Sequence, residues 1–353
     1  MATIDADTHV IETDRTWEYM TKAEAEFKPR FVVEPDPPTG LKFSLKGSGQ
    51  FWLIDGKIHP RQLFDPEKTR TPAASRELLD VGARLRHMDE LGTDIQVMYP
   101  TLFLFRTASR PEVELALCRS YNRWLADVWK ESKDRLRWVV NPPLRSMDKA
   151  LEELRFGKQN GACGVFMLGV YEDMLPINPY FLPIYEEASR LDMPVCFHSG
   201  SASVTFEQMF PDAETLIWSA KAPTIAAFHT LLLSQIPDKF PTLRWAFVEA
   251  SGSFVPFVLH DLRARYQRIY GKQLQMENVL QDNRFYVTCQ TDDDLPYVLK
   301  YAGQQNLVIG TDYGHADTAS ELEALIILER DADISVEAKH KILDDNARAL
   351  YGI

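Results

Sequence analysis

The sequence predicts a (β/α)8 TIM barrel with one β-rich insertion, and two observations support this fold class. Short apolar runs typical of buried strands alternate along the chain with segments of helical period, and each connection is long enough for a parallel crossover. Several of these runs end in a histidine or a carboxylate, which is where parallel barrels place their chemistry. We therefore expect residues 1–353 to form one barrel domain.

The expected strands are short, apolar and followed by polar residues, and they cover residues 3–6, 94–99, 136–140, 164–168, 194–197, 243–248, 284–288 and 307–309. Helices are expected at 77–91, 110–132, 147–159, 179–191, 225–233, 256–270, 320–330 and 336–351. In the first helix, apolar residues recur at helical spacing from Leu78 to Leu91, and Gly92 ends it. This alternation matches one barrel with its outer ring of helices.

Residues 22–75 do not fit the barrel period. Prolines punctuate the segment, and short strands are expected at 31–33, 42–45 and 51–54. Asp55-Gly56 is a hairpin-type turn directly after the last of them. We expect this segment to be an inserted, β-rich flap beside the mouth of the site, since insertions of this length are usually lids or flexible ornament.

Composition narrows the function classes. Hydrophobic residues make up 45% and charged residues 25% of the chain, which is typical of a globular protein with a large core. The net charge of -12 argues against nucleic acid or an anionic membrane as partner, and no apolar run approaches the roughly 20 residues of a membrane span. The N-terminus has no signal-like segment and the four cysteines are scattered. We expect a cytoplasmic protein with reduced thiols and a small-molecule substrate.

Four side chains at predicted strand ends form a candidate metal-ligand set. Asp7 and His9 are two residues apart on the first strand, so both side chains leave the same face. His198 ends the fifth strand and Asp312 follows the eighth, and a barrel brings all of these ends to one cavity. Two nitrogens and two carboxylate oxygens suit one divalent ion, Zn²⁺ first, with Mn²⁺ or Fe²⁺ as alternatives.

An ordered set of motifs carries a family resemblance. It comprises Asp-Ala-Asp-x-His near the N-terminus, Pro-x-x-x-His on the fifth strand, Phe-Pro-x-Leu-Arg before the sixth, Gly-Thr-Asp-Tyr-x-His on the eighth and Asp-Asn-Ala-Arg-Ala-Leu-Tyr-Gly at the C-terminus. Over residues 3–352 the chain resembles the amidohydrolase superfamily. It is most similar to the group with aminocarboxymuconate-semialdehyde, γ-resorcylate and carboxyvanillate decarboxylases. The resemblance implies a homodimer and one catalytic metal, bound by Asp7, His9, His198 and Asp312.

The chain departs from the pattern of this group at two positions. The first-strand pair is Asp7-Thr8-His9, where the superfamily often has His-x-His and aromatic decarboxylases can have Glu-x-His. Glu249 stands where the decarboxylases have a histidine. A second carboxylate repels a substrate carboxylate, whereas it can take a proton from a metal-bound water. We therefore expect hydrolysis, with Glu249 or Asp312 as general base.

Further candidate residues lie outside the metal-ligand set. His229 lies on an apolar helix and is either a second catalytic base or a packing histidine. His315 is expected to contact substrate or a metal ligand, and Tyr99 to line the pocket. Glu12 either orients His9 or caps the following turn. Residues 102–105 suit an aromatic or acyl substrate, or equally pack against the flap or a second subunit.

The function that best fits these features is a metal-dependent hydrolase acting on an ester, thioester, lactone or amide of a small organic acid through a metal-activated water. The alternative is a metal-dependent, non-oxidative decarboxylase of an aromatic or unsaturated acid. A third hypothesis, a non-catalytic metal- or partner-binding barrel, is less favoured because a complete ligand set is present.

Overall fold

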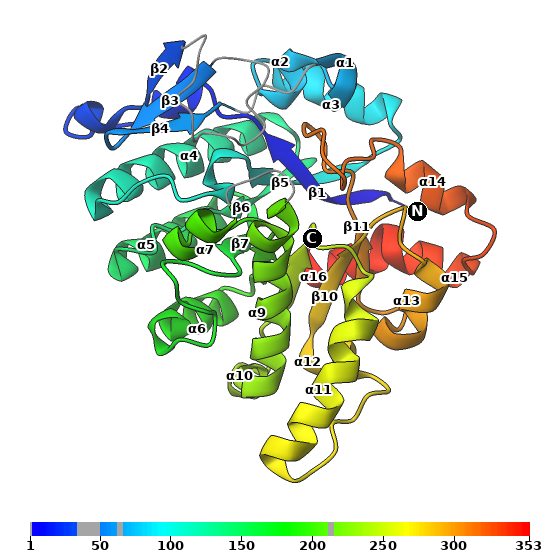
Figure 1. The fold of residues 1–353 in the computed structure, drawn as a ribbon. Coiled ribbons are helices and arrows are strands. Elements are labelled where there is room, and N and C mark those ends of the chain that lie inside the picture. The colour runs from blue at the N-terminus through cyan, green and yellow to red at the C-terminus, as the bar shows by residue number, and fades with distance from the viewer. Residues whose placement is uncertain (1, 34–49, 62–65, 211–214) are drawn as a thin grey trace.

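The structure is a computed structural model, and it describes residues 2–33, 50–61, 66–210 and 215–353. An eight-stranded parallel sheet, in the order β1-β5-β6-β7-β8-β9-β10-β11, forms the centre of the molecule (Figure 1). Its strands are β1 Ile4–Val10, β5 Ile95–Pro100, β6 Leu136–Val140, β7 Ala162–Leu168, β8 Val195–His198, β9 Trp245–Val248, β10 Phe285–Cys289 and β11 Leu307–Ile309. All eight strands predicted from apolar runs are present, so the barrel prediction is confirmed.

The barrel closes between its first strand and the residues after its last. The His9 amide donates to the Tyr313 carbonyl at 2.8 Å, and the Asp312 amide donates to the Asp7 carbonyl at 2.9 Å. Glycine is required at Gly310, because a Cβ there would lie 2.3 Å from the Cβ of Asp7. This close approach brings the polar ends of β1 and β11 side by side.

A buried carboxylate fastens the same closure. Asp5 accepts hydrogen bonds from the Thr311 amide at 2.9 Å and the Thr311 hydroxyl at 2.6 Å. Burial raises the pKa of the Asp5 carboxyl to about 7, although the bonds from Thr311 oppose that rise. Asp5 was not among the residues predicted for the site, yet it joins β1, which carries Asp7, to the segment after β11 that carries Asp312.

Helices surround the barrel (Figure 1). They are α3 Val81–Glu90, α4 Pro111–Glu131, α5 Met147–Gln159, α6 Leu182–Arg190, α7 Val204–Met209, α8 Leu216–Ser219, α9 Lys221–Ser234, α10 Ile236–Lys239, α11 Phe254–Tyr270, α12 Val279–Asn283, α13 Leu295–Ala302, α14 Ala324–Arg330, α15 Val336–His340 and α16 Asn346–Tyr351. A π-helical turn, Lys341–Asp345, interrupts the helix expected over 336–351.

Helix α13 was not predicted. Its first turn is capped by Asp294, whose side chain accepts from the Tyr297 amide at 3.0 Å, and its buried face is Leu295, Val298 and Ala302. Only eight residues long, it offers too few turns for a clear periodic signal.

The insertion contains a three-stranded antiparallel sheet of β2 Arg30–Val33, β3 Gln50–Ile54 and β4 Lys57–Pro60. The hairpin turn at Asp55-Gly56 is confirmed, and β4 was not expected. The strand predicted at 42–45 lies outside the described residues. Two short helices, α1 Pro66–Thr69 and α2 Ala73–Arg76, complete the segment. Asp55 accepts from the amides of Ser109 (2.7 Å) and Arg110 (3.1 Å), which fixes the hairpin on the start of α4.

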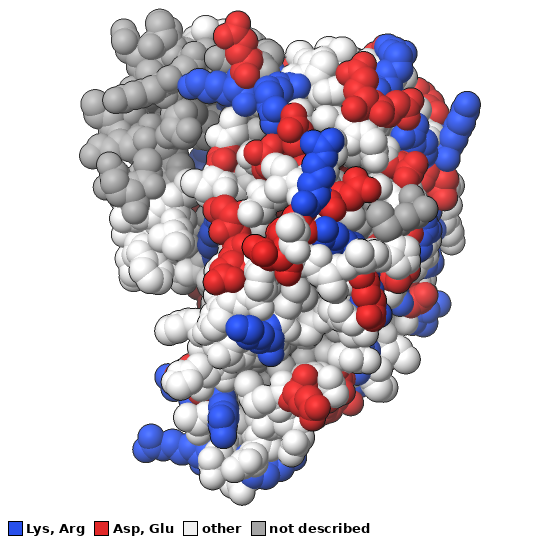
Figure 2. All heavy atoms as spheres, turned by 90° about the vertical axis from the view of Figure 1, so that its right-hand side faces the viewer, with Lys and Arg blue, Asp and Glu red and all other residues white. Residues whose placement is uncertain are grey.

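Charged side chains of both signs are interspersed on the face shown in Figure 2. No helix in the described part of the chain is long and apolar enough to cross a membrane. The four cysteines are buried and unbridged, in agreement with the expectation of reduced core thiols.

Candidate metal centre and active site

Five buried side chains converge at the C-terminal ends of the barrel strands. Asp7 and His9 come from β1, His198 is the last residue of β8, Glu249 follows β9 and Asp312 lies just beyond β11. Each is less than a tenth exposed. We refer to these five residues as the carboxylate–imidazole cluster. The structure therefore brings together all four predicted metal ligands and the predicted base at strand six.

The cluster is compact around the two imidazole Nε2 atoms. His9 Nε2 lies 3.3 Å from Asp312 Oδ1, 3.6 Å from Asp7 Oδ1 and 3.7 Å from Glu249 Oε2. His198 Nε2 lies 3.2 Å from Asp7 Oδ1 and 3.4 Å from Glu249 Oε2. Two ligand atoms, each about 2.1 Å from a common metal ion, are about 3.0–3.4 Å apart. The observed separations are close to that spacing.

Backbone carbonyls set the orientation of both rings. His9 Nδ1 lies 3.0 Å from the Pro100 carbonyl oxygen, and His198 Nδ1 lies 3.0 Å from the Ser199 carbonyl oxygen. Because a carbonyl only accepts, each Nδ1 carries the proton and donates. When the rings are neutral, their Nε2 lone pairs point into the cluster, as metal-ligating histidines require.

Several buried polar atoms of the cluster have no hydrogen-bond partner. They are His9 Nε2, Glu249 Oε2 and Asp312 Oδ1. Leaving such atoms unpaired costs about 1–3 kcal/mol each. One cation between them would satisfy all three, and imidazole nitrogens with carboxylate oxygens suit Zn²⁺, Mn²⁺ or Fe²⁺. The donor set fits a divalent metal.

The electrostatics of the cluster also favour a cation. Burial raises the pKa of Glu249 and of Asp312 well above the ordinary range, and the nearby Asp317 charge raises both further. Burial opposes protonation of His198, but the charges of Asp7 and Glu249 outweigh it and raise its pKa to about 9. Within the described residues, no lysine or arginine forms an ion pair with Asp7, Glu249 or Asp312.

Backbone strain coincides with the two strand-end acids. Glu249 has φ of 60° and Asp312 has φ of 52°, the left-handed region that a non-glycine residue occupies at a cost of about 1–2 kcal/mol. Asp293 supports the turn after Glu249, where it accepts from the Gly252 amide at 2.8 Å and the Ser253 amide at 3.1 Å. The fold thus sustains a strained conformation that aims both carboxylates into the cluster.

A second layer of side chains contacts the cluster. The His315 ring stacks on His9 with centroids 3.7 Å apart, and its Nδ1 lies 2.9 Å from Asp312 Oδ1. The Thr101 hydroxyl donates to the Val10 carbonyl at 2.8 Å, so it accepts from His315 Nε2, which lies 2.9 Å away. With its proton on Nε2, the His315 ring donates to Thr101 and turns the lone pair of Nδ1 toward Asp312 Oδ1.

Tyr99 lies beneath the same rings. Its ring centroid is 4.9 Å from that of His198, and its hydroxyl pairs with the Tyr351 hydroxyl at 2.8 Å. Tyr99 thus forms part of the floor under the cluster, and its hydroxyl is directed to Tyr351.

Two other predicted residues do not join the cluster. The Glu12 carboxylate accepts from the amides of Thr101 (3.1 Å) and Leu102 (3.0 Å), so it caps the turn after β5. Burial raises the pKa of Glu12 to about 7. His229 lies on α9, where its Nε2 is 3.2 Å from Asp261 Oδ2 of α11. This contact of His229 joins two outer helices.

Sequence reasoning missed three residues that support the cluster. Ser320 donates a short hydrogen bond to Asp312 Oδ2, Thr101 holds His315, and Arg84 Nη1 donates to the His9 carbonyl at 3.2 Å. Thr101 directly follows a strand end, which is a usable signal in a barrel. Ser320 and Arg84 lie in a loop and a helix whose distance from the cluster depends on tertiary packing.

A family model described as amidohydrolase matches residues 4–353. The chain belongs to the amidohydrolase family. The resemblance drawn from the five sequence motifs is therefore confirmed, and the protein is an enzyme of that family.

Solved structures share the fold of this amidohydrolase-family enzyme. An amidohydrolase from Mycobacterium avium subsp. paratuberculosis K-10 is 18% identical with a TM-score of 0.78, and the match covers 99% of each chain. The 5-carboxyvanillate decarboxylase of Sphingomonas paucimobilis is 17% identical with a TM-score of 0.71, covering 100% of this chain and 99% of that one. The 4-oxalomesaconate hydratase of Rhodopseudomonas palustris is 16% identical with a TM-score of 0.64, covering 99% and 96%. At these identities the likeness shows a common fold, and the activities named are those of the relatives.

Proposed function

We propose that this amidohydrolase-family enzyme hydrolyses an ester, thioester, lactone or amide of a small organic acid with one divalent metal ion. The observation that carries the proposal is the position of Glu249. Its Oε2 is buried without a hydrogen-bond partner and lies 3.4 Å from His198 Nε2 and 3.7 Å from His9 Nε2. A general base for water belongs at such a position.

Asp7, His9, His198 and Asp312 would hold the metal, with Zn²⁺ as the first choice. When bound, the metal acidifies water and polarises the substrate carbonyl. Glu249 accepts the proton of the attacking water and returns it to the leaving group. Ser320 fixes the direction of Asp312, since its hydroxyl donates a hydrogen bond to Asp312 Oδ2.

Decarboxylation is the second candidate function, supported by the shared fold with 5-carboxyvanillate decarboxylase. Charge argues against it as first choice. A substrate carboxylate at the cluster would meet the carboxylates of Asp7, Glu249 and Asp312 within one buried site. Like charges in a low-dielectric site repel strongly, so a neutral acyl group is the better ligand.

A homodimer in the cytoplasm completes the proposal. The family resemblance supports the dimer, and the composition with reduced cysteines supports the compartment. Light scattering on the purified protein tests the first point: a mass near 40.4 kDa would indicate a monomer and contradict it.

The reaction is tested by product analysis in ¹⁸O-labelled water. Metal-loaded enzyme is incubated with a panel of aryl and acyl esters, thioesters, lactones and amides, alongside the corresponding free aromatic acids. The proposal predicts one ¹⁸O in the product carboxylate and no release of CO₂. Release of CO₂ from a free acid, without ¹⁸O in the product, would establish the decarboxylase instead.

A further inference from the structure

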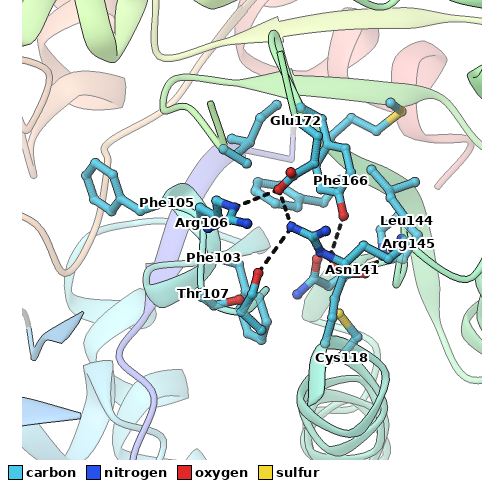
Figure 3. A pocket seen from close by; sticks show the side chains of 17 residues that line it. Phe103, Phe105, Arg106, Thr107, Cys118, Asn141, Leu144, Arg145, Phe166 and Glu172 are labelled. Carbon is cyan, nitrogen blue, oxygen red and sulfur yellow. Dashed lines mark hydrogen bonds and ion pairs between the residues drawn. The ribbon is translucent and has the colours of Figure 1, made fainter. Parts of the chain in front are cut away.

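The cavity drawn in Figure 3 is lined mainly by residues at or after the ends of β5, β6 and β7. Its empty space, including the opening to solvent, is about 450 Å³. Leu168 lines it and is the sheet neighbour of His198, while the Phe166 ring, also in its wall, is 6.3 Å from the His198 ring. The cavity and the cluster therefore share one wall of the barrel mouth.

The cavity walls are largely apolar and aromatic. Phe103, Phe105, Leu144, Phe166 and Leu168 line it. Such walls favour a flat ring or a short acyl chain over a polar, flexible substituent.

The charged groups in the cavity neutralise one another. Arg106 Nε lies 2.7 Å from Glu172 Oε1, and Arg145 forms a second, short ion pair with the same carboxylate (Figure 3). The Glu114 carboxylate accepts from the Arg145 amide at 2.8 Å and from the Tyr171 hydroxyl. Two arginines thus face two glutamates, and a further anion would enter beside both glutamates with no spare cation to meet it.

Two donors in the cavity remain without a partner. Asn141 is only 4% exposed, and its Nδ2 has no hydrogen-bond partner. The Arg145 Nε is likewise buried and unpaired, since Glu114 Oε1 at 3.9 Å is too distant for a hydrogen bond. Asn141 is held at the end of β6 by Asn122, which bonds both its amide and its carbonyl. A ligand with an acceptor oxygen would satisfy these two unpaired donors.

We infer that this cavity binds the non-reacting part of the substrate, as an uncharged aryl or short acyl group whose carbonyl oxygen accepts from Asn141 Nδ2 and Arg145 Nε. This inference rests on the proposed function, because it takes the ligand of the cavity to be part of the substrate of the proposed hydrolase. With that oxygen bound, the reacting group reaches past Phe166 to the cluster at His198. The cavity selects neutral oxygen acceptors and rejects free carboxylates.

Ligand binding tests this inference without any need for turnover. Acetophenone, benzoate and ethylbenzene share one ring and differ in the group offered to the donors. Their affinities for the full-length, metal-loaded protein are compared by saturation-transfer NMR at pH 7.5. The expected order is acetophenone first, with benzoate and ethylbenzene each at least about tenfold weaker, the value of one hydrogen bond of about 1.4 kcal/mol.

Asn141→Leu removes the donor at similar size, and Asn141→Ser keeps a small polar group but shortens its reach. Both are expected to weaken acetophenone about tenfold and leave ethylbenzene unchanged. If Asn141→Leu does not fold, Asn141→Ser alone decides the matter. Benzoate binding tighter than acetophenone, or acetophenone binding unchanged in the folded Asn141 variant, would overturn the inference.

The metal-ligand variant His198→Ala separates this inference from the proposed function. Its cavity donors are intact, so it is expected to bind acetophenone within about twofold of wild type; loss of binding there would count against a separate subsite. If no compound in the hydrolysis panel is turned over, the proposed function is contradicted. The order of ligand affinities would still test the cavity independently.

Discussion

The barrel mouth has two halves that handle buried charge in opposite ways. In the carboxylate–imidazole cluster, three carboxylates face two imidazoles, and no lysine or arginine pairs with them in the described part of the chain. In the cavity next to it, two glutamates are matched by Arg106 and Arg145. Both halves are built on the ends of neighbouring parallel strands. The difference shows what each can bind: the first half needs a cation, and the second takes a neutral ligand.

The largest effect is expected from removal of the proposed base. Glu249→Gln keeps the shape of the side chain but cannot accept a proton, so turnover of the best ester should fall about 10²- to 10⁴-fold. Steady-state kinetics of the metal-loaded enzyme measure this fall in turnover, and Glu337→Gln, at an exposed position, serves as the control. Turnover within threefold of wild type would remove Glu249 from the mechanism.

Stability of the metal-free protein sharpens the comparison, because neutralising one glutamate in each half should act in opposite directions. Glu172→Gln leaves Arg106 and Arg145 without their shared carboxylate and should cost about 1–3 kcal/mol of unfolding free energy. Glu249→Gln relieves repulsion from Asp317 and Asp7 and should stabilise by about 1 kcal/mol. Urea unfolding measures both, and the same sign for the two variants would contradict the contrast.

The pH dependence of the metal-free protein gives a smaller signal. The pKa of His198 is raised to about 9, and those of Glu249 and Asp312 lie well above their ordinary values. Folded protein therefore binds more protons than unfolded protein between about pH 6.5 and 9. Its unfolding free energy should fall as pH rises there, by about 1.4 kcal/mol per pH unit for each extra proton.

Below about pH 6.5 the trend should weaken. The pKa of His9 is lowered by burial and by its histidine neighbours, and that of His315 is lowered to about 4 by burial. The unfolded chain gains protons at these residues that the folded chain does not, and this offsets the extra protons that the folded chain holds on Asp5, Glu12, Glu249 and Asp312. Thermal melts across pH 5.5–9, with and without added Zn²⁺, measure the stability in both pH ranges. If the stability of the metal-free protein stays constant or rises from pH 6.5 to 9, the raised pKa values of His198, Glu249 and Asp312 are contradicted.

The smallest effect is expected at His229. Its partner Asp261 is on a neighbouring helix and both side chains are partly exposed, so the pair should contribute about 0–1 kcal/mol. His229→Ala should retain the metal and turn over normally, as elemental analysis and kinetics would record. A loss of turnover with the metal retained would revive the interpretation of His229 as a second base.

The sequence was sufficient to predict the strands and the cluster for a physical reason. A barrel brings all strand ends to one cavity, so a polar residue after an apolar run is placed without knowledge of packing. Asp7, His198, Glu249 and Asp312 each have that local signature. Weaker local signals failed, as with the short helix α13 and the π-helical turn inside the last predicted helix.

The supporting groups could not be predicted in this way. Asp5 looks like one more acid beside Asp7, and only strand closure shows that it binds Thr311. The supporting role of Asp293 arises only because its loop packs against the loop that contains Gly252 and Ser253, whose amides it accepts from. Asn141 and Arg145 are candidate ligand-binding residues because Asn141 Nδ2 and Arg145 Nε have no hydrogen-bond partner in the packed structure. Sequence spacing does not show which donors remain unpaired.

Metal content tests the central claim most directly. Purified wild-type protein, His198→Ala and the exposed-residue control His260→Ala are incubated with Zn²⁺, Mn²⁺ or Fe²⁺, dialysed and measured by elemental analysis. The account predicts about one ion per chain in wild type and in His260→Ala, the stoichiometry of a mononuclear site, and close to none in His198→Ala. Wild-type protein that gains none of these ions would contradict the metal centre and the hydrolase proposed on it.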